Sequence, residues 1–165
     1  LNISCPNVED KGLVAQSKDA TYNLVKKVRE LTDKTLITKL SPNVTDIVAI
    51  AQAACRGGTD AVSLVNTFFG MAIDIETKKP KLGNISGGLS GPCIKPIALK
   101  MVWDVARSIK KPVIGMGGIM NAGDAIEFLI AGAKAIQVGT ANFVDPSVCE
   151  KIIKGIETYS RKNKL

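Results

Sequence analysis

The residues that could do chemistry follow apolar runs, at the points where strands of a sheet would end. In chain order these segments are residues 2–7 (Asn-Ile-Ser-Cys-Pro-Asn), Lys39, Asn66-Thr67, Gly117-Gly118 and Gly139-Thr140. Parallel α/β folds bind their ligands where the carboxyl ends of the strands meet. Because each of these segments consists of polar residues or glycine, the sequence predicts one shared site at that edge.

Two glycine segments have the composition of phosphate sites. Gly117-Gly118 precedes a helical pattern that starts near Asn121, and Gly139-Thr140 precedes another helical segment. Glycine lets the backbone approach an anion closely, and the N–H groups at a helix start point toward it. Either segment alone is typical of an ordinary turn, but together they predict a phosphate-binding site. Residues 87–92 (Gly-Gly-Leu-Ser-Gly-Pro) add a third segment rich in backbone amides.

Cys5 is the candidate general base, because it ends a predicted strand and the following proline fixes the chain. A thiol titrates at about pH 8.5, so it needs a neighbouring positive charge or hydrogen-bond donors to act as a base. An isolated cysteine can equally be a small buried hydrophobic residue. We interpret Cys55, Cys93 and Cys149 in that second way.

Four polar residues could bind a ligand. Lys39 lies in an apolar run, where an unpaired lysine is costly to bury. It would be well placed beside an anionic or electron-rich ring, or its stem could extend to solvent at the rim. Asn2, Asn7 and Asn66 can each donate and accept hydrogen bonds, which suits an imide or amide substrate. Each could equally serve a turn or a helix cap.

The composition excludes several classes of function. The chain has 165 residues, 45% of them hydrophobic, and no histidine, so it holds no Ser-His-Asp or Cys-His pair and no His-ligated metal. Its four cysteines form no C-x-x-C motif, so we expect no metal site and interpret the thiols as reduced and the location as cytoplasmic. No apolar run reaches the about 20 residues of a membrane span, and no signal peptide opens the chain.

The net charge of +7 favours anionic ligands. The basic residues are scattered and few aromatic residues lie among them, so we expect solvated helix faces and no nucleic-acid or membrane partner.

Short β-branched runs alternate with helical patterns along the chain. Strands are expected over residues 36–40, 61–66, 112–116 and 135–139. Helices are expected over residues 22–31, 47–55, 97–109, 122–131 and 148–159. Residues 73–82 resemble a hairpin inside the longest irregular stretch, 67–96. This alternation predicts right-handed βαβ units and a parallel sheet, in a single domain over residues 1–165 with no linker.

In order and spacing, these segments resemble dihydroorotate dehydrogenase over essentially the whole chain. The most specific part of the resemblance is the occurrence of both segments, residues 2–7 and residues 87–92, in one chain. The resemblance implies an FMN-binding TIM (β/α)8 barrel that oxidises dihydroorotate to orotate in pyrimidine (UMP) biosynthesis. A full barrel needs about 250 residues. We therefore expect the second half of a barrel, strands 4 to 8, and the start at Leu1 suggests part of a longer polypeptide.

The resemblance also implies a role for each site residue. Cys5 would be the base that takes a proton from C5 of the substrate, while hydride passes from C6 to N5 of the flavin. Lys39 would contact the flavin ring near N1. Substrate contacts are implied for Asn2, Asn7, Asn66 and Thr67. Cofactor contacts are implied for Asn2, Lys39, Val65, Gly91, Gly117, Gly118, Gly139 and Thr140.

In having a cysteine at the position of the base, the chain resembles the soluble class 1 enzymes of the family. Residues 73–80 and 87–92 resemble the NAD-dependent 1B subtype more than the fumarate-dependent one, and the acceptor stays open between NAD and fumarate. The 1B subtype pairs its FMN subunit with a second subunit carrying FAD and a [2Fe–2S] cluster. We also expect a homo-oligomer.

The first three barrel strands have no counterpart here, and their loops supply further flavin contacts and a substrate-binding lysine in the family. We therefore expect the separate chain to be inactive. Two alternatives stay open. One is a non-catalytic half-barrel that self-associates through unpaired strand edges. The other is a flavin-free phosphate-binding barrel enzyme with no need of Cys5.

Overall fold

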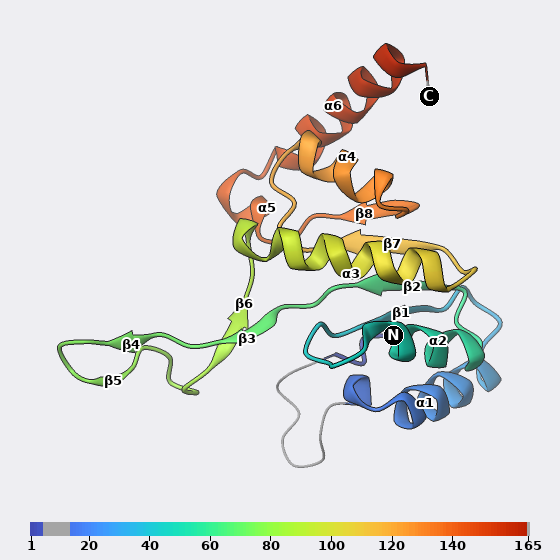
Figure 1. The fold of residues 1–165 in the computed structure, drawn as a ribbon, viewed down its shortest axis with the longest axis horizontal. Coiled ribbons are helices and arrows are strands. Elements are labelled where there is room, and N and C mark those ends of the chain that lie inside the picture. The colour runs from blue at the N-terminus through green and yellow to red at the C-terminus, as the bar shows by residue number, and fades with distance from the viewer. Residues whose placement is uncertain (5–13, 165) are drawn as a thin grey trace.

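The computed structural model describes residues 1–4 and 14–164. Its centre is a parallel sheet of four strands in the order β1-β2-β7-β8 (Figure 1). The strands are β1 (Ile37–Lys39), β2 (Ala61–Leu64), β7 (Val113–Met116) and β8 (Ala135–Gln137). Each lies inside a run expected to be a strand, so the predicted parallel sheet is confirmed.

The beginning of the chain runs along the outer edge of β1. Asn2 forms an isolated parallel bridge with Lys39, whose N–H donates to the Leu1 carbonyl at 2.9 Å. Among the described residues this bridge is all that represents the first expected strand. It brings the Asn2 side of the predicted site next to the Lys39 side.

Five longer helices connect the strands. They are α1 (Lys18–Glu30), α2 (Ile47–Arg56), α3 (Lys95–Ser108), α4 (Ala122–Ile130) and α6 (Val148–Asn163). They pack in series, α1 on α2, α2 on α3, α3 on α4 and α4 on α6, which forms one layer of helices beside the sheet (Figure 1). All five predicted helices are confirmed.

The helix boundaries follow from local caps. Asp46 accepts the N–H of Ala49 at 3.0 Å and starts α2. Asn121 accepts the N–H of Asp124 at 3.0 Å and starts α4, near the position expected. Helix α1 begins earlier than predicted because Ser17 caps it. Helix α3 begins earlier because a 3-10 turn, η2 (Pro92–Ile94), leads directly into it. Shorter pieces are η1 (Val14–Gln16) and α5 (Ala141–Val144), which follows Gly139-Thr140 as predicted.

The core lies between the sheet and the helix layer. All of β2 is buried, and Val62 and Leu64 are fully covered. Val102 of α3 and Phe128 of α4 are also fully buried and belong to the same cluster. Each such side chain contributes about 1.5–3 kcal/mol by leaving water, which holds the helices against the sheet.

Residues 67–91 leave the body as an extended arm (Figure 1). Strand β4 (Ile73–Asp74) pairs with β5 (Lys79–Pro80), which confirms the expected hairpin. A second antiparallel pair, β3 (Phe68–Gly70) with β6 (Gly87–Leu89), was not predicted. The sequence did not indicate strand β6, because two of its three residues are glycine and glycine is rare in strands. At Gly88 a Cβ would lie 2.8 Å from Thr67 Cβ, so this close approach excludes larger side chains.

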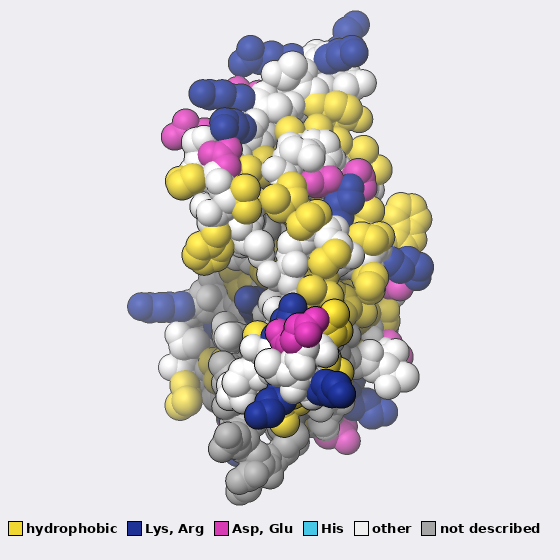
Figure 2. Space-filling model, turned by 90° about the vertical axis from the view of Figure 1, so that its left-hand side faces the viewer, with side chains coloured by type: hydrophobic (Ala, Val, Ile, Leu, Met, Phe, Trp, Pro, Cys, Tyr) yellow, Lys and Arg dark blue, Asp and Glu magenta, His cyan; other side chains and the backbone are white. Residues whose placement is uncertain are grey.

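The surface carries exposed hydrophobic side chains as well as charged ones. Figure 2 views the molecule from the end at which the arm projects, and hydrophobic groups are visible there among charged residues. Ile75 on the arm is 81% exposed and Phe143 on α5 is 93% exposed. The paired lysines Lys26-Lys27 and Lys110-Lys111 are exposed, as the charge pattern predicted. In residues 1–4 and 14–164, no helix combines the length and apolarity needed to cross a membrane.

The interpretation of the cysteines as buried hydrophobic residues is wrong for Cys93 and Cys149. Both are exposed. Cys93 lies on η2, and Cys149 lies in the first turn of α6, with its Sγ 3.3 Å from Asn142 Oδ1. Cys55 in α2 is half-buried, and burial raises the pKa of its thiol.

We predict that Gly115→Ala destabilises the fold by about 1–3 kcal/mol, the usual cost of overpacking a core. A Cβ at Gly115 in β7 would lie 2.7 Å from the ring of the fully buried Phe128. Urea unfolding would measure the change. Gly83→Ala is the matched control, because nothing lies within 4 Å of its Cβ position; it should shift stability by less than about 0.5 kcal/mol. Equal effects of the two substitutions would contradict this packing.

Candidate functional site

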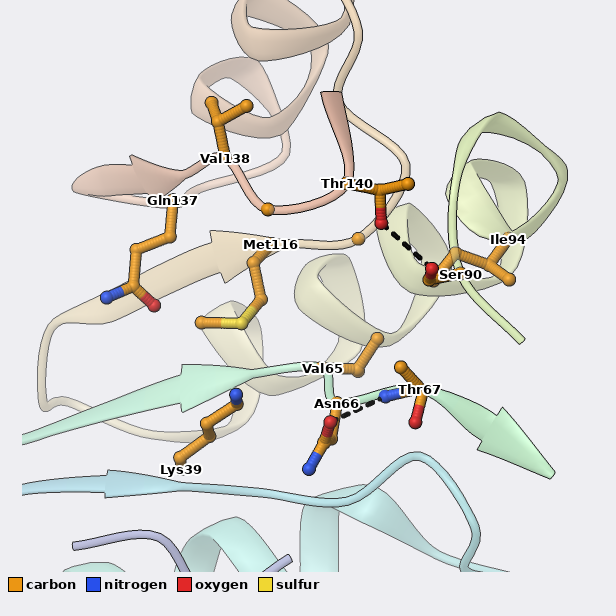
Figure 3. Close-up of a pocket in the computed structure, with 12 residues that line it drawn as sticks. Lys39, Val65, Asn66, Thr67, Ser90, Ile94, Met116, Gln137, Val138 and Thr140 are labelled. Carbon is orange, nitrogen blue, oxygen red and sulfur yellow. Dashed lines mark hydrogen bonds between the residues drawn. The ribbon is translucent and has the colours of Figure 1, made fainter. Parts of the chain in front are cut away.

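The loops that follow the parallel strands surround a cavity of about 450 Å³ (Figure 3). Seven of the predicted site residues line it, namely Lys39, Val65, Asn66, Thr67, Gly117, Gly139 and Thr140. They come from four different strand ends, and parallel strand order brings those ends to one edge. The single shared edge that the sequence predicted is therefore present in the structure.

Lys39 supplies the positive charge of this cavity. Its ammonium group points inward, toward Met116 (Figure 3), so it does not extend away from the site. It is the one charged side chain among the lining residues. No carboxylate in residues 1–4 and 14–164 forms an ion pair with it. The cavity therefore favours a ligand with an anionic or electron-rich group on that side.

A hydrogen-bond network joins Asn66 to the beginning of the chain. Asn66 Nδ2 donates to the carbonyl and to Oγ of Ser4 at 2.9 and 2.8 Å. Ser4 Oγ donates to Asn2 Oδ1 at 2.9 Å, and the Thr67 N–H donates to Asn66 Oδ1 at 2.8 Å. Asn2 does not line the cavity, but this network and its bridge to Lys39 hold it at the border.

The glycine segments form the opposite wall. Gly117 and Gly118 have φ values of +125° and +76°, and Gly91 has +90°, all in the region that favours glycine. A Cβ on Gly118 would lie 2.8 Å from both the Gly91 carbonyl oxygen and the Lys95 nitrogen. Gly117 lines the cavity, whereas Gly91 and Gly118 do not line it but contact each other through their backbones immediately beside Gly117.

The donor groups of this wall suit a phosphate. No hydrogen bond within the described residues uses the N–H of Gly118, Gly139 or Thr140. No atom lies within 4 Å of a Cβ placed on Gly139, so an anion could approach that backbone. Thr140 Oγ1 donates to Ser90 Oγ at 2.8 Å and fixes the loop (Figure 3). Free donors on one side and Lys39 on the other fit a ligand such as FMN, which combines a phosphate with a ring that becomes electron-rich when it is reduced.

Comparison with known proteins gives the family. The model of the family described as dihydroorotate dehydrogenase matches residues 1–159. The chain belongs to the dihydroorotate dehydrogenase family. The resemblance expected from the motifs is thereby confirmed.

Matches to individual members of the family agree with that result. The catalytic subunit of dihydroorotate dehydrogenase B (NAD(+)) from Geotalea uraniireducens is 57% identical over 99% of this chain and 54% of its own length. The one from Porphyromonas gingivalis is 58% identical over 99% of this chain and 53% of its own. A crystal structure of the Eimeria tenella enzyme in complex with ferulenol matches with a TM-score of 0.77 and 25% identity, covering 99% of this chain and 50% of that one. The chain spans about half the length of the relatives it matches.

Two of the predicted site residues, Cys5 and Asn7, lie outside the described residues. Sequence reasoning missed other residues that line the cavity, namely Ser90, Ile94, Met116, Gln137 and Val138. Two of them carried a signal, since Gln137 is a polar residue within a predicted strand and Ser90 lies in the 87–92 run. Ile94, Met116 and Val138 are apolar, and nothing local separates them from core residues.

We predict that Gly118→Ala destabilises the fold by about 2 kcal/mol or more, because a Cβ would both strain the backbone and meet the backbone of Gly91 and Lys95. Gly139→Ala, with open space at its Cβ, should stay within about 0.5 kcal/mol. Thermal and urea unfolding would compare the two. A Gly118→Ala protein as stable as Gly139→Ala would show that the turn is not closely packed.

Proposed function

We propose that this chain provides the flavin-binding wall and the general base of an FMN-dependent dihydroorotate dehydrogenase, which oxidises dihydroorotate to orotate in pyrimidine biosynthesis. One observation carries the proposal: Lys39 faces a glycine wall with unused N–H donors across a single cavity. Membership of the family and the 57% identical relative support the same reaction.

The parallel sheet is an arc of a TIM barrel that corresponds to strands 4 to 8, within one domain over residues 1–165. The single layer of helices packed in series supports this, because barrel helices form a ring around the strands. The match to half of a solved family structure with a TM-score of 0.77 supports it as well.

FMN bound in the cavity would supply the acceptor for the hydride from C6 of the substrate. Gly117, Gly118, Gly139 and Thr140 would hold its phosphate through backbone N–H groups, and Gly91 would support that turn. Val65 is 3% exposed and would pack along the ring. Lys39 would stand near N1, where its charge favours the electron-rich form of the ring.

Asn2, Asn7, Asn66 and Thr67 would bind the substrate. Both amide hydrogens of Asn66 are already used on Ser4, so Asn66 offers an acceptor lone pair on Oδ1. That lone pair suits an N–H of the dihydroorotate ring. The network to Ser4 and Asn2 fixes the orientation of the amide before substrate arrives.

Cys5 would act as the base. Its thiolate would take the proton from C5 of dihydroorotate, and the electron pair of that C–H bond would form the C5–C6 double bond as hydride leaves C6. The neighbouring Ser4 is 2% exposed and is tied to Asn66, so the chain is fixed up to the residue before the base.

Partners follow from the subtype. We propose an electron-transfer subunit with FAD and a [2Fe–2S] cluster, NAD as the final acceptor, and assembly as a homo-oligomer. Two relatives over 55% identical are named as catalytic subunits of a NAD(+) enzyme, which supports the first two of these.

The test is flavin binding followed by reduction, on the full-length protein that carries this chain. After incubation with FMN and desalting, the protein should keep the visible flavin spectrum, and dihydroorotate should bleach it without oxygen. Lys39→Met should slow this bleaching by about a hundredfold, the usual cost of losing one group that stabilises developing charge.

Lys100→Met is the matched control, because Lys100 lies on α3 and its side chain is 70% exposed. It should bleach at the wild-type rate. Retained FMN that dihydroorotate does not reduce would contradict the proposed substrate. A protein that binds no FMN would point instead to a flavin-free enzyme.

A second prediction concerns Cys5. Cys5→Ser should leave a weaker base, so the rate of dihydroorotate oxidation should fall at neutral pH and recover only at higher pH. The pH profile of flavin reduction in stopped flow measures this. Cys93→Ser, at an exposed cysteine outside the cavity, is the control. A profile that Cys5→Ser leaves unchanged would exclude Cys5 as the base.

A further inference from the structure

One carboxylate connects the two sides of the Gly117-Gly118 turn. Asp124 Oδ1 lies 2.6 Å from Lys95 Nζ, and Asp124 Oδ2 accepts the N–H of Met120 at 2.9 Å. Lys95 is the first residue of α3, whereas Met120 follows the turn and precedes α4. Asp124 therefore ties the start of one helix to the segment that leads from the glycines into the next.

The start of α3 touches the Gly117-Gly118 turn directly. The backbone of Lys95 packs on Gly118, because a Cβ there would lie 2.8 Å from the Lys95 nitrogen and 2.9 Å from its Cα. A Cβ on Gly117 would lie 2.7 Å from Ala98, one helical turn farther along α3. The turn thus rests on the first turn of α3, and Asp124 fastens that contact from the α4 side.

The ion pair is shielded from water. The side chains of Lys95 and Asp124 are 25% and 13% exposed. Burial alone would raise the pKa of Asp124, but the hydrogen bonds from Lys95 and from the Met120 N–H outweigh it and leave the pKa below its usual range. The hydrogen bond to Asp124 in turn raises the pKa of Lys95. Both groups are charged at neutral pH, so the contact persists under the conditions in which the site would work.

We propose that Asp124 is a positioning residue for the phosphate-binding wall: by holding Lys95 and the Met120 N–H together, it fixes Gly117 and Gly118 in the left-handed conformation that aims their backbone at the phosphate. The inference rests on the proposed FMN site and deepens it. The ammonium group of Lys95 is paired with Asp124 and Glu127, so its charge acts on the turn through Asp124 and not on a ligand.

Glu127 offers a matched control on the same lysine. Its Oε1 lies 2.9 Å from Lys95 Nζ, but its side chain is 48% exposed. Within the part of the chain that the structure describes, its carboxylate makes no hydrogen bond to residues 117–121. Removing its charge alters the surroundings of Lys95 without releasing the turn.

The experiment compares two flavins. FMN and riboflavin share the ring and differ in the phosphate, so the ratio of their Kd values isolates the phosphate wall. In the full-length protein, flavin fluorescence titrations would measure both constants for wild type, Asp124→Asn and Glu127→Gln. Asp124→Asn should raise the Kd of FMN by about tenfold, the effect of one lost charge-assisted hydrogen bond. It should change the Kd of riboflavin by less than about twofold, and Glu127→Gln should change neither by more than about twofold.

Two further variants keep the test decisive. If Asp124→Asn does not fold, Lys95→Met breaks the same ion pair from the α3 side and should give the same rise in the FMN to riboflavin Kd ratio. Lys95→Arg should keep the wild-type ratio, because it preserves the charge.

Equal weakening of FMN and riboflavin binding by Asp124→Asn would mean a merely structural role and would overturn the inference. If wild type prefers FMN and Asp124→Asn binds both flavins with the wild-type Kd values, the inference is overturned as well. A wild type with no preference for FMN would overturn the proposed phosphate wall and this inference with it.

Discussion

The arrangement of the site depends on the burial of β2 between β1 and β7. Its residues are all buried, so both neighbours must stay hydrogen-bonded to it along its length. Parallel neighbours cannot be joined by a tight turn and need a helical crossover, so each strand starts at the same edge of the sheet. The carboxyl ends of all the strands, and the residues that follow them, therefore lie at the other edge. Lys39, Asn66 and Gly117 meet there although long stretches of sequence separate them.

The two sides of the cavity are ordered by different forces. On the Asn66 side, side-chain hydrogen bonds to Ser4 and Asn2 set the direction of polar groups. On the glycine side, steric contact of Gly118 with the backbone of Lys95 sets the position of N–H donors. Both sides are therefore ordered before a ligand arrives, one by side-chain hydrogen bonds and the other by packing of backbone on backbone. The first arrangement suits a small polar substrate, and the second suits a phosphate.

The sequence predicted what depends on local patterns. Apolar runs that end in polar residues identified the strands, and with them Lys39 and Gly139. The helix start near Asn121 was predicted as well, because a helix start depends mainly on neighbouring residues. Tertiary features were beyond reach: the exposure of Cys93 depends on which way a turn faces, and the β3–β6 pairing depends on a close approach that glycine allows. The Lys95–Asp124 pair joins residues 29 positions apart that no motif links.

The arm has a consequence for how this site can vary. The arm leaves the cavity wall at Thr67 and returns to it at Ser90, and the β3–β6 ladder closes it immediately beyond those residues. The entropic cost of closing a loop grows only slowly with its length. Segments between Gly70 and Gly87 can therefore lengthen, shorten or change composition while the ladder keeps both wall residues in position. One short pair of strands thus separates a segment whose length can change from the geometry of the cavity wall.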